Sequence, residues 1–179
     1  MENKDLIDKN FQKYMKIALS EAKKAFDANE VPIGAVIISP TGEVVSKAHN
    51  LTETKKNPLC HAEILAIQKA CKKINEKYLM DYSIFVTLEP CPMCATAISL
   101  AKIKNIYFAS SDEKGGAVLN GIQLYKTAKN LYKPNYFYGC FDSESSELLK
   151  IFFKNLRKNN KNKWKTSWNR VKNRLLYVC

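Results

Sequence analysis

The sequence of 179 residues lacks any long apolar run. No stretch approaches the roughly 20 apolar residues that a membrane-spanning helix requires. The first residues, 1–8, also lack an apolar segment followed by a cleavage site, so no secretory signal peptide is predicted. We therefore expect a cytoplasmic protein that has no membrane partner.

Acidic residues are absent from the C-terminal segment. Residues 154–179 contain nine Lys or Arg residues and no Asp or Glu, whereas the first 153 residues carry 20 basic and 17 acidic residues. The net charge of +12 therefore resides mainly at one end of the chain. Such an end indicates a polyanion partner. The alternative is compositional drift, because Lys greatly outnumbers Arg and Asn is abundant.

A disulfide framework is also not expected. The six cysteines occur in a chain of this size without a secretory signal. Disulfide-dense chains are typically short secreted domains, so these cysteines are predicted to be reduced thiols or metal ligands.

Hydrophobic periodicity predicts strands that alternate with helices. Apolar residues spaced by three and four predict an amphipathic helix over 11–26, and a continuous apolar run predicts a buried strand over 33–38. Further strands are predicted at 43–48, 83–88, 105–109 and 136–139, and further helices at 61–74, 92–101, 122–128 and from about 142 onward. The pattern favours a three-layer α/β/α sandwich with a five-stranded sheet and helices on both faces. Segment 159–179, which contains two tryptophans, is either disordered until bound or an extension of the last helix.

Two short segments carry the ligand types of a zinc site. His61-Ala62-Glu63 lies at a predicted helix start, and Pro90-Cys91-Pro92-Met93-Cys94 lies where a strand runs into a helix. Imidazole and thiolate are typical zinc ligands. Cys91 and Cys94 share the first turn of one helix, where unpaired N–H groups favour thiolates. Three protein ligands leave one position open for water, which is typical of catalytic zinc.

Glu63 has a predicted task in that site. Two thiolates neutralise Zn²⁺ and weaken its effect on the acidity of a bound water. A carboxylate two positions from a ligand can accept the proton of that water and pass it to a leaving group. The residues alone leave two alternatives open. Cys91 and Cys94 could form a dithiol redox pair, or a structural zinc site could recruit a fourth ligand from Cys60, Cys71, Cys140 or His49.

From about Tyr14 to Arg157 the sequence resembles bacterial tRNA-specific adenosine deaminases, the TadA family of the cytidine-deaminase-like superfamily. His-x-Glu followed 27 residues later by Pro-Cys-x-x-Cys is the zinc signature of nucleobase deaminases. The segments that favour the tRNA enzymes are Glu30-Val31-Pro32-Ile33-Gly34-Ala35, Asp112-Glu113-Lys114-Gly115-Gly116-Ala117 and Phe152-Phe153-Lys154-Asn155-Leu156-Arg157.

The resemblance implies a cytidine-deaminase-like fold with a mixed five-stranded sheet, a deaminase domain over 1–158 and a basic tail over 159–179. It implies one Zn²⁺ per subunit, Glu63 as the catalytic proton shuttle and a homodimer. The implied reaction converts adenosine to inosine at the wobble position of a tRNA anticodon, in an arginine tRNA by the family's usual substrate, through hydroxide attack on C6 and loss of ammonia. The implied zinc ligands are His61, Cys91 and Cys94, and the implied substrate contacts are Asn50, Asp112, Lys114, Asn135, Phe153 and Arg157.

Three other functions compete with this one. A zinc deaminase of a free nucleobase or nucleoside, of guanine or cytosine type, would share the Pro-Cys-Pro-Met-Cys segment. A non-catalytic RNA-binding subunit could dispense with Glu63, which is present. A dithiol redox protein would carry no zinc.

Overall fold

The computed structural model describes the backbone of residues 9–175 and the side chains of residues 11–158. Helices and strands alternate through most of the chain, at positions close to those that the periodicity predicts. In chain order the elements are α1 (Lys9–Asp27), β1 (Gly34–Ile38), β2 (Val44–His49), α2 (Ala62–Ile74), β3 (Ser83–Leu88), α3 (Pro92–Leu100), β4 (Asn105–Ser110), α4 (Leu124–Thr127), β5 (Asn135–Tyr138) and α5 (Asp142–Leu175).

The five strands form one mixed sheet in the order β2-β1-β3-β4-β5. β1 is antiparallel to both of its neighbours, whereas β3, β4 and β5 are parallel. β2 and β3 therefore run in the same direction, and their carboxyl ends lie at one edge of the sheet together with that of β4. The segments that follow these three strands carry most of the predicted site residues.

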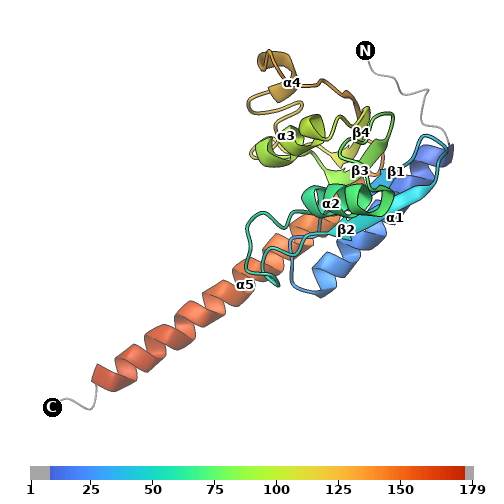
Figure 1. The fold of residues 1–179 in the computed structure, drawn as a ribbon. Coiled ribbons are helices and arrows are strands. Elements are labelled where there is room, and N and C mark those ends of the chain that lie inside the picture. Colours follow the sequence, from blue (N-terminus) through green and yellow to red (C-terminus); the bar gives the residue numbers. More distant parts are fainter. Residues whose placement is uncertain (1–8, 176–179) are drawn as a thin grey trace.

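Helices cover both faces of the sheet, as Figure 1 shows. One core cluster joins the sheet to α2, α3 and α4, and a second joins the opposite face to α1, with aromatic residues at its centre. All five residues of β1 are buried, which explains its unbroken apolar sequence. The predicted three-layer sandwich is confirmed.

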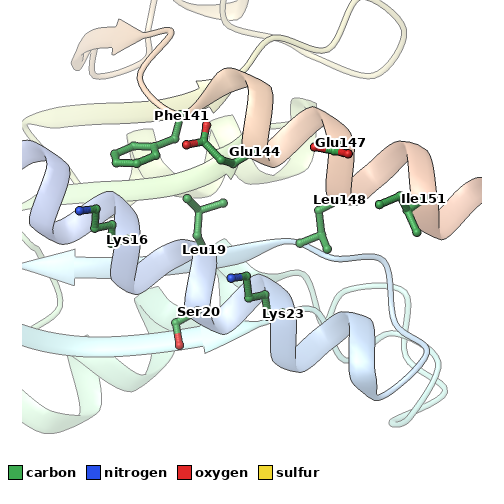
Figure 2. Close-up of a pocket in the computed structure, with 9 residues that line it drawn as sticks. All are labelled: Lys16, Leu19, Ser20, Lys23, Phe141, Glu144, Glu147, Leu148 and Ile151. Carbon is green, nitrogen blue, oxygen red and sulfur yellow. The ribbon is translucent and has the colours of Figure 1, made fainter.

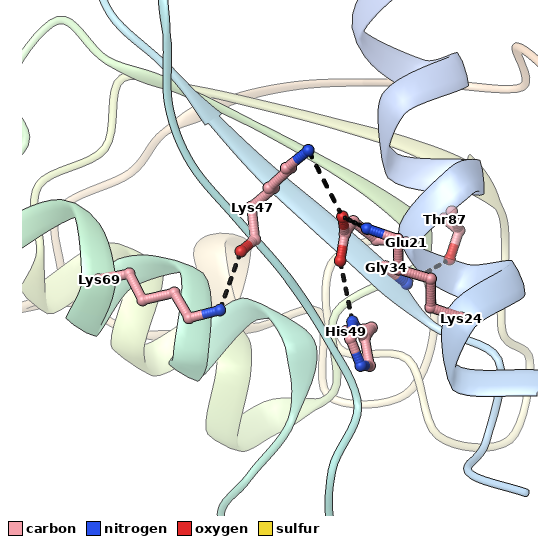
Figure 3. A network of polar contacts seen from close by, with 7 residues as sticks. All are labelled: Glu21, Lys24, Gly34, Lys47, His49, Lys69 and Thr87. Carbon is pink, nitrogen blue, oxygen red and sulfur yellow. Dashed lines mark hydrogen bonds and ion pairs between the residues drawn. The ribbon is translucent and has the colours of Figure 1, made fainter. Parts of the chain in front are cut away.

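Gly34 at the start of β1 permits the close approach of α1. A Cβ atom on Gly34 would lie 2.0 Å from the carbonyl oxygen of Ala18, so only glycine fits there. The neighbouring carboxylate of Glu21 accepts hydrogen bonds from Lys24 at 2.7 Å and from Nδ1 of His49 at 2.9 Å (Figure 3). This contact fixes the end of β2 to α1 directly before Asn50.

α5 packs against α1 and β4 and then continues as a helix away from the sheet (Figure 1). Residues 159–175, for which the sequence left disorder and helix extension open, are therefore helical. A pocket of about 530 Å³ lies between α1 and α5 (Figure 2), but its lining includes none of the predicted site residues. Within residues 9–175, no helix combines the length and apolarity needed to cross a bilayer.

Candidate active site

Two helix N-termini present the three candidate metal ligands. His61 is the N-cap residue of α2 and Cys91 is the N-cap residue of α3, both with extended backbone conformation and neither with a side-chain capping hydrogen bond. Pro92 occupies the first turn of α3, where its missing N–H costs nothing. The side chains of His61 and Cys91 are therefore free for other contacts, and Cys94 lies in the first turn of α3.

The ligand atoms of these residues are spaced as a zinc ion requires. The sulfurs of Cys91 and Cys94 lie 3.7 and 3.6 Å from Nδ1 of His61, and the three ligand atoms all lie within 4.8 Å of one another. Tetrahedral bonds of about 2.3 Å to sulfur and 2.0 Å to nitrogen would separate such atoms by roughly 3.6 Å. The cluster of His61, Cys91 and Cys94 thus fits Zn²⁺.

The two thiols of the cluster have opposite acidities because they share a hydrogen bond. The bond with Cys94, together with one from His61, lowers the pKa of Cys91 to about 4. The same contact, together with burial, raises the pKa of Cys94. The contacts within the protein therefore favour a thiolate at Cys91 and a protonated thiol at Cys94. A divalent cation between the sulfurs would favour the second thiolate too, because its charge offsets their repulsion.

Glu63 differs from every other buried polar side chain among residues 11–158. It lies in the first turn of α2, is 4% exposed, and its Oε2 atom has no hydrogen-bond partner. Burial raises the pKa of Glu63 to about 6, and the negative charge of Cys91 acts in the same direction. A carboxylate with an unpartnered oxygen and a near-neutral pKa is suited to accept and donate a proton.

Asn50 follows β2 at the same edge of the sheet and is buried. Its Nδ2 donates to the carboxylate of Glu30 at 3.0 Å, which also accepts from the backbone N–H groups of Glu53 and Thr54. The next residue, Leu51, donates its N–H to the carbonyl of Cys60, beside His61. The loop that follows Asn50 lines a pocket of about 490 Å³ together with His61.

Asp112 and Lys114 follow β4 at this edge too. The carboxylate of Asp112 accepts hydrogen bonds from the backbone N–H groups of Lys114 and Gly115, both at 3.0 Å. These bonds stabilise the turn that Asp112 begins. Lys114 is exposed. The loop is joined to the cysteine segment, because Ala117 donates its N–H to the carbonyl of Pro90.

The remaining predicted substrate contacts lie elsewhere. Asn135 begins β5 opposite Asn105, which in turn pairs with Ser83 at the start of β3. It therefore lies at the other edge of the sheet, about 16 Å along the strands from their carboxyl ends, and the structure does not bring it to the cluster. Phe153, 40% exposed, and Arg157, also exposed, lie on α5.

Cys60, one of the possible fourth ligands, is instead buried in the core. Within the part of the chain that the structure describes, no fourth His, Cys, Asp or Glu joins the cluster, so a four-ligand structural site is not formed. Two buried carboxylates that hold the neighbouring loops, Glu30 and Glu89, were not predicted from the sequence. The only sequence signal was an acidic residue at the end of an apolar or helical segment, close before a proline.

Known proteins resemble this chain in sequence and in fold. A family model described as MafB19-like deaminase matches residues 9–157. A tRNA-specific adenosine deaminase of Rickettsia bellii is 44% identical over 144 residues, which is 80% of this chain and 99% of that protein. A solved structure from a study of A-to-I editing by tRNA:A34 deaminases has a TM-score of 0.74 at 39% identity and covers 76% of this chain and 99% of that chain. A guanine deaminase from Bacillus subtilis has a TM-score of 0.53 at 34% identity and covers 56% of this chain and 64% of that chain.

The family match ends at residue 157 and includes the cluster of His61, Cys91 and Cys94, Glu63 and both flanking loops. Identity and coverage are higher for the two tRNA deaminases than for the guanine deaminase. The basic segment beyond residue 158 lies outside the family match. The chain belongs to the deaminases of the MafB19-like family model and to the family of tRNA-specific adenosine deaminases.

Proposed function

We propose that this chain is a zinc-dependent deaminase that converts adenosine to inosine at wobble position 34 of a tRNA anticodon. The observation that carries the proposal is the three-ligand cluster with the unpartnered carboxylate oxygen of Glu63 close by in sequence and space. The relatives' activity on tRNA adenosine supports the substrate class. A loop base suits such a site, because it is already unpaired and needs little energy to enter a pocket.

His61, Cys91 and Cys94 would hold the metal. Zinc, when bound, supplies the Lewis acidity that activates a water for attack on C6 of the purine. The Glu63 carboxylate accepts one proton from the attacking water and passes it to N1 of the ring. It then takes the second proton from the new hydroxyl on C6 and gives it to the amino group, which leaves as ammonia. Its burial keeps bulk water from competing for that proton, and its unpartnered Oε2 leaves the acceptor position free.

Asn50, Asp112 and Lys114 are our proposed contacts to the nucleoside and its neighbours, because all three follow strands that end at the cluster's edge of the sheet. Phe153 and Arg157 offer an aromatic face and a cation on α5, a combination that stacks on bases and pairs with phosphates. Asn135 remains a candidate by resemblance alone. We further propose an arginine tRNA as substrate, a homodimer as the assembly and the cytoplasm as the location.

The direct test is inosine formation at position 34 of an anticodon stem-loop. We expect product from the zinc-loaded wild type and none from Glu63→Ala, which should retain its zinc. A folded, zinc-loaded wild type that forms no inosine on the stem-loop but deaminates free guanine, cytosine or adenosine would establish a free-base enzyme instead. The likeness to the Bacillus subtilis guanine deaminase makes guanine the first of those substrates to try.

We also propose that residues 1–158 are the deaminase domain and that the basic segment 159–179 adds contacts to the tRNA backbone. Six Lys or Arg residues and no acidic residue in this segment support this role. Removing cations that neutralise phosphates should weaken binding and flatten the dependence of affinity on salt. A protein truncated after Lys158 should therefore bind tRNA more weakly at low salt and with a smaller salt slope. Unchanged affinity and slope would exclude a role in RNA binding.

A further inference from the structure

Glu89 lies at the end of β3, two residues before Cys91, and its side chain is 3% exposed. Its carboxylate accepts five hydrogen bonds, all from the loop of residues 112–120. Oε1 accepts the backbone N–H groups of Val118, Leu119 and Asn120 at 2.8–3.0 Å. Oε2 accepts the N–H of Asp112 at 2.9 Å and the Nδ2 donor of Asn120 at 2.6 Å.

No ion pair involves Glu89 among the described side chains. Its charge is therefore balanced by N–H groups of a single loop. Removing the donors of a buried carboxylate costs far more than removing those of an exposed one, because neither water nor a cation replaces them. Opening the loop would leave this charge unsatisfied, so the loop is held in one conformation.

Gly116 shows how closely the loop passes over the carboxylate. A Cβ atom at Gly116 would lie 2.3 Å from Cδ of Glu89 and 2.5 Å from the carbonyl oxygen of Asp112. The loop is also tied to the metal-binding segment by the N–H of Ala117, which donates to the carbonyl of Pro90. Through these contacts the loop is joined to the segment that leads into α3.

We propose that Glu89 is a positioning residue that sets the place of the 112–120 loop, and with it Asp112 and Lys114, relative to the metal ligands. The proposal rests on the proposed function, because these two residues are assigned to the RNA substrate there. Glu89 itself does not touch the reacting atoms. It acts through the loop, so its removal should affect substrate binding much more than the chemical step.

The test uses the full-length, zinc-loaded protein with Glu89→Gln. Glutamine keeps the size but turns one acceptor oxygen into a donor facing N–H groups. We expect KM for the anticodon stem-loop to rise roughly tenfold or more while kcat stays within about threefold. Amide hydrogen exchange in 112–120 should become at least about tenfold faster while that of β1 and β3 is unchanged. Asn120→Ala, which removes one of the five donors, should change both quantities less and in the same direction.

Ser145→Ala is the matched control. Its hydroxyl is buried and donates to the carbonyl of Thr87 in β3 rather than to the loop. An unchanged KM and unchanged loop exchange in Glu89→Gln would overturn the proposal. So would an equal rise of KM in Ser145→Ala, or a loss of zinc that accounts for the defect. If the wild type forms no inosine, the proposed function fails, and the exchange measurement alone decides whether Glu89 holds the loop.

Discussion

Glu63 and Glu89 each lie two residues from a member of the cluster of His61, Cys91 and Cys94 and are almost equally buried, at 4% and 3% exposure, but their carboxylates have opposite environments. Glu89 accepts five hydrogen bonds, and Glu63 leaves Oε2 without any partner. Burial raises the pKa of both groups. In Glu89 the N–H donors outweigh burial and the pKa falls below its usual value, whereas in Glu63 it rises to about 6.

Burial alone therefore does not determine what a carboxylate does at this site. A carboxylate that is satisfied by N–H groups stays ionised and holds a loop, as Glu89 does. Glu30 has the same environment at the loop after Asn50, where hydrogen bonds from Thr54 and Glu53 outweigh burial and lower its pKa. A carboxylate with an unpartnered oxygen is poised to exchange a proton, and only Glu63 among these three meets that condition.

Glu63→Gln should have the largest effect on activity. It also distinguishes most clearly between the environments of the Glu63 and Glu89 carboxylates. Loss of a general acid–base typically lowers turnover by about 10²–10⁴-fold. The free energy of unfolding should stay the same or rise, because the raised pKa means that the native state disfavours the ionised carboxylate. Single-turnover inosine formation and denaturant unfolding, with zinc content as control, measure both. A large loss of stability would show that Glu63 is held by hydrogen bonds, as Glu89 is.

Gly116→Ala should damage the Glu89 contacts without changing the carboxylate. Its Cβ meets Cδ of Glu89 and a backbone oxygen, neither of which can move easily, so we expect destabilisation by about 1–3 kcal/mol. Gly115→Ala is the matched control. Its Cβ would lie 2.9 Å from Oδ2 of Asp112, the end of a flexible side chain, so its cost should be clearly smaller. Thermal unfolding measures the destabilisation in both variants. Equal destabilisation by Gly116→Ala and Gly115→Ala would mean that the loop is loosely held, against this prediction.

The convergence of His61, Cys91 and Cys94 and the position of Glu63 in the first turn of α2 could be predicted from the sequence, because both depend on local features. His61 and Cys91 precede amphipathic helices, and a buried strand leads directly into Cys91, so spacing alone indicated that their side chains converge. The sandwich followed from the alternation of strands and helices. These features need no knowledge of distant contacts.

Residues that act over long sequence separations could not be predicted in this way. Glu30 and Glu89 bond to loops more than 20 residues away, as the bonds to Thr54 and to Leu119 show, and no periodicity reports such contacts. Asn135 stays a predicted substrate contact by resemblance. Its position at the opposite edge of the sheet from the cluster follows from strand register, which depends on the assembled β-sheet rather than on local sequence.

The pH dependence of stability in Glu30→Gln tests whether hydrogen bonds stabilise the ionised carboxylate of Glu30 as they do that of Glu89. The pKa of Glu30 is lowered by folding, so its contribution to stability is fully present above the unfolded value of about 4.5 and is lost as the pH falls through the native value. At neutral pH we expect the variant to be less stable by about 1–2 kcal/mol. The difference from the wild type should shrink in acid. A difference that is constant with pH would mean that the charge of Glu30 contributes nothing.

Thr52→Val should have the smallest effect, because it removes one polar side chain from the Glu30 cluster and leaves the backbone donors in place. Thr52 donates to Glu30 at a long 3.3 Å and accepts from Nδ2 of Asn50 at 3.0 Å. Removing these two neutral-donor hydrogen bonds should cost about 0.5–1.5 kcal/mol. If loop closure depends chiefly on the N–H groups of Glu53 and Thr54, amide exchange in 50–57 should change little in this variant and much more in Glu30→Gln. Equal exchange in the two would show that side-chain donors, rather than backbone N–H groups, hold this loop, and the parallel between Glu30 and Glu89 would not stand.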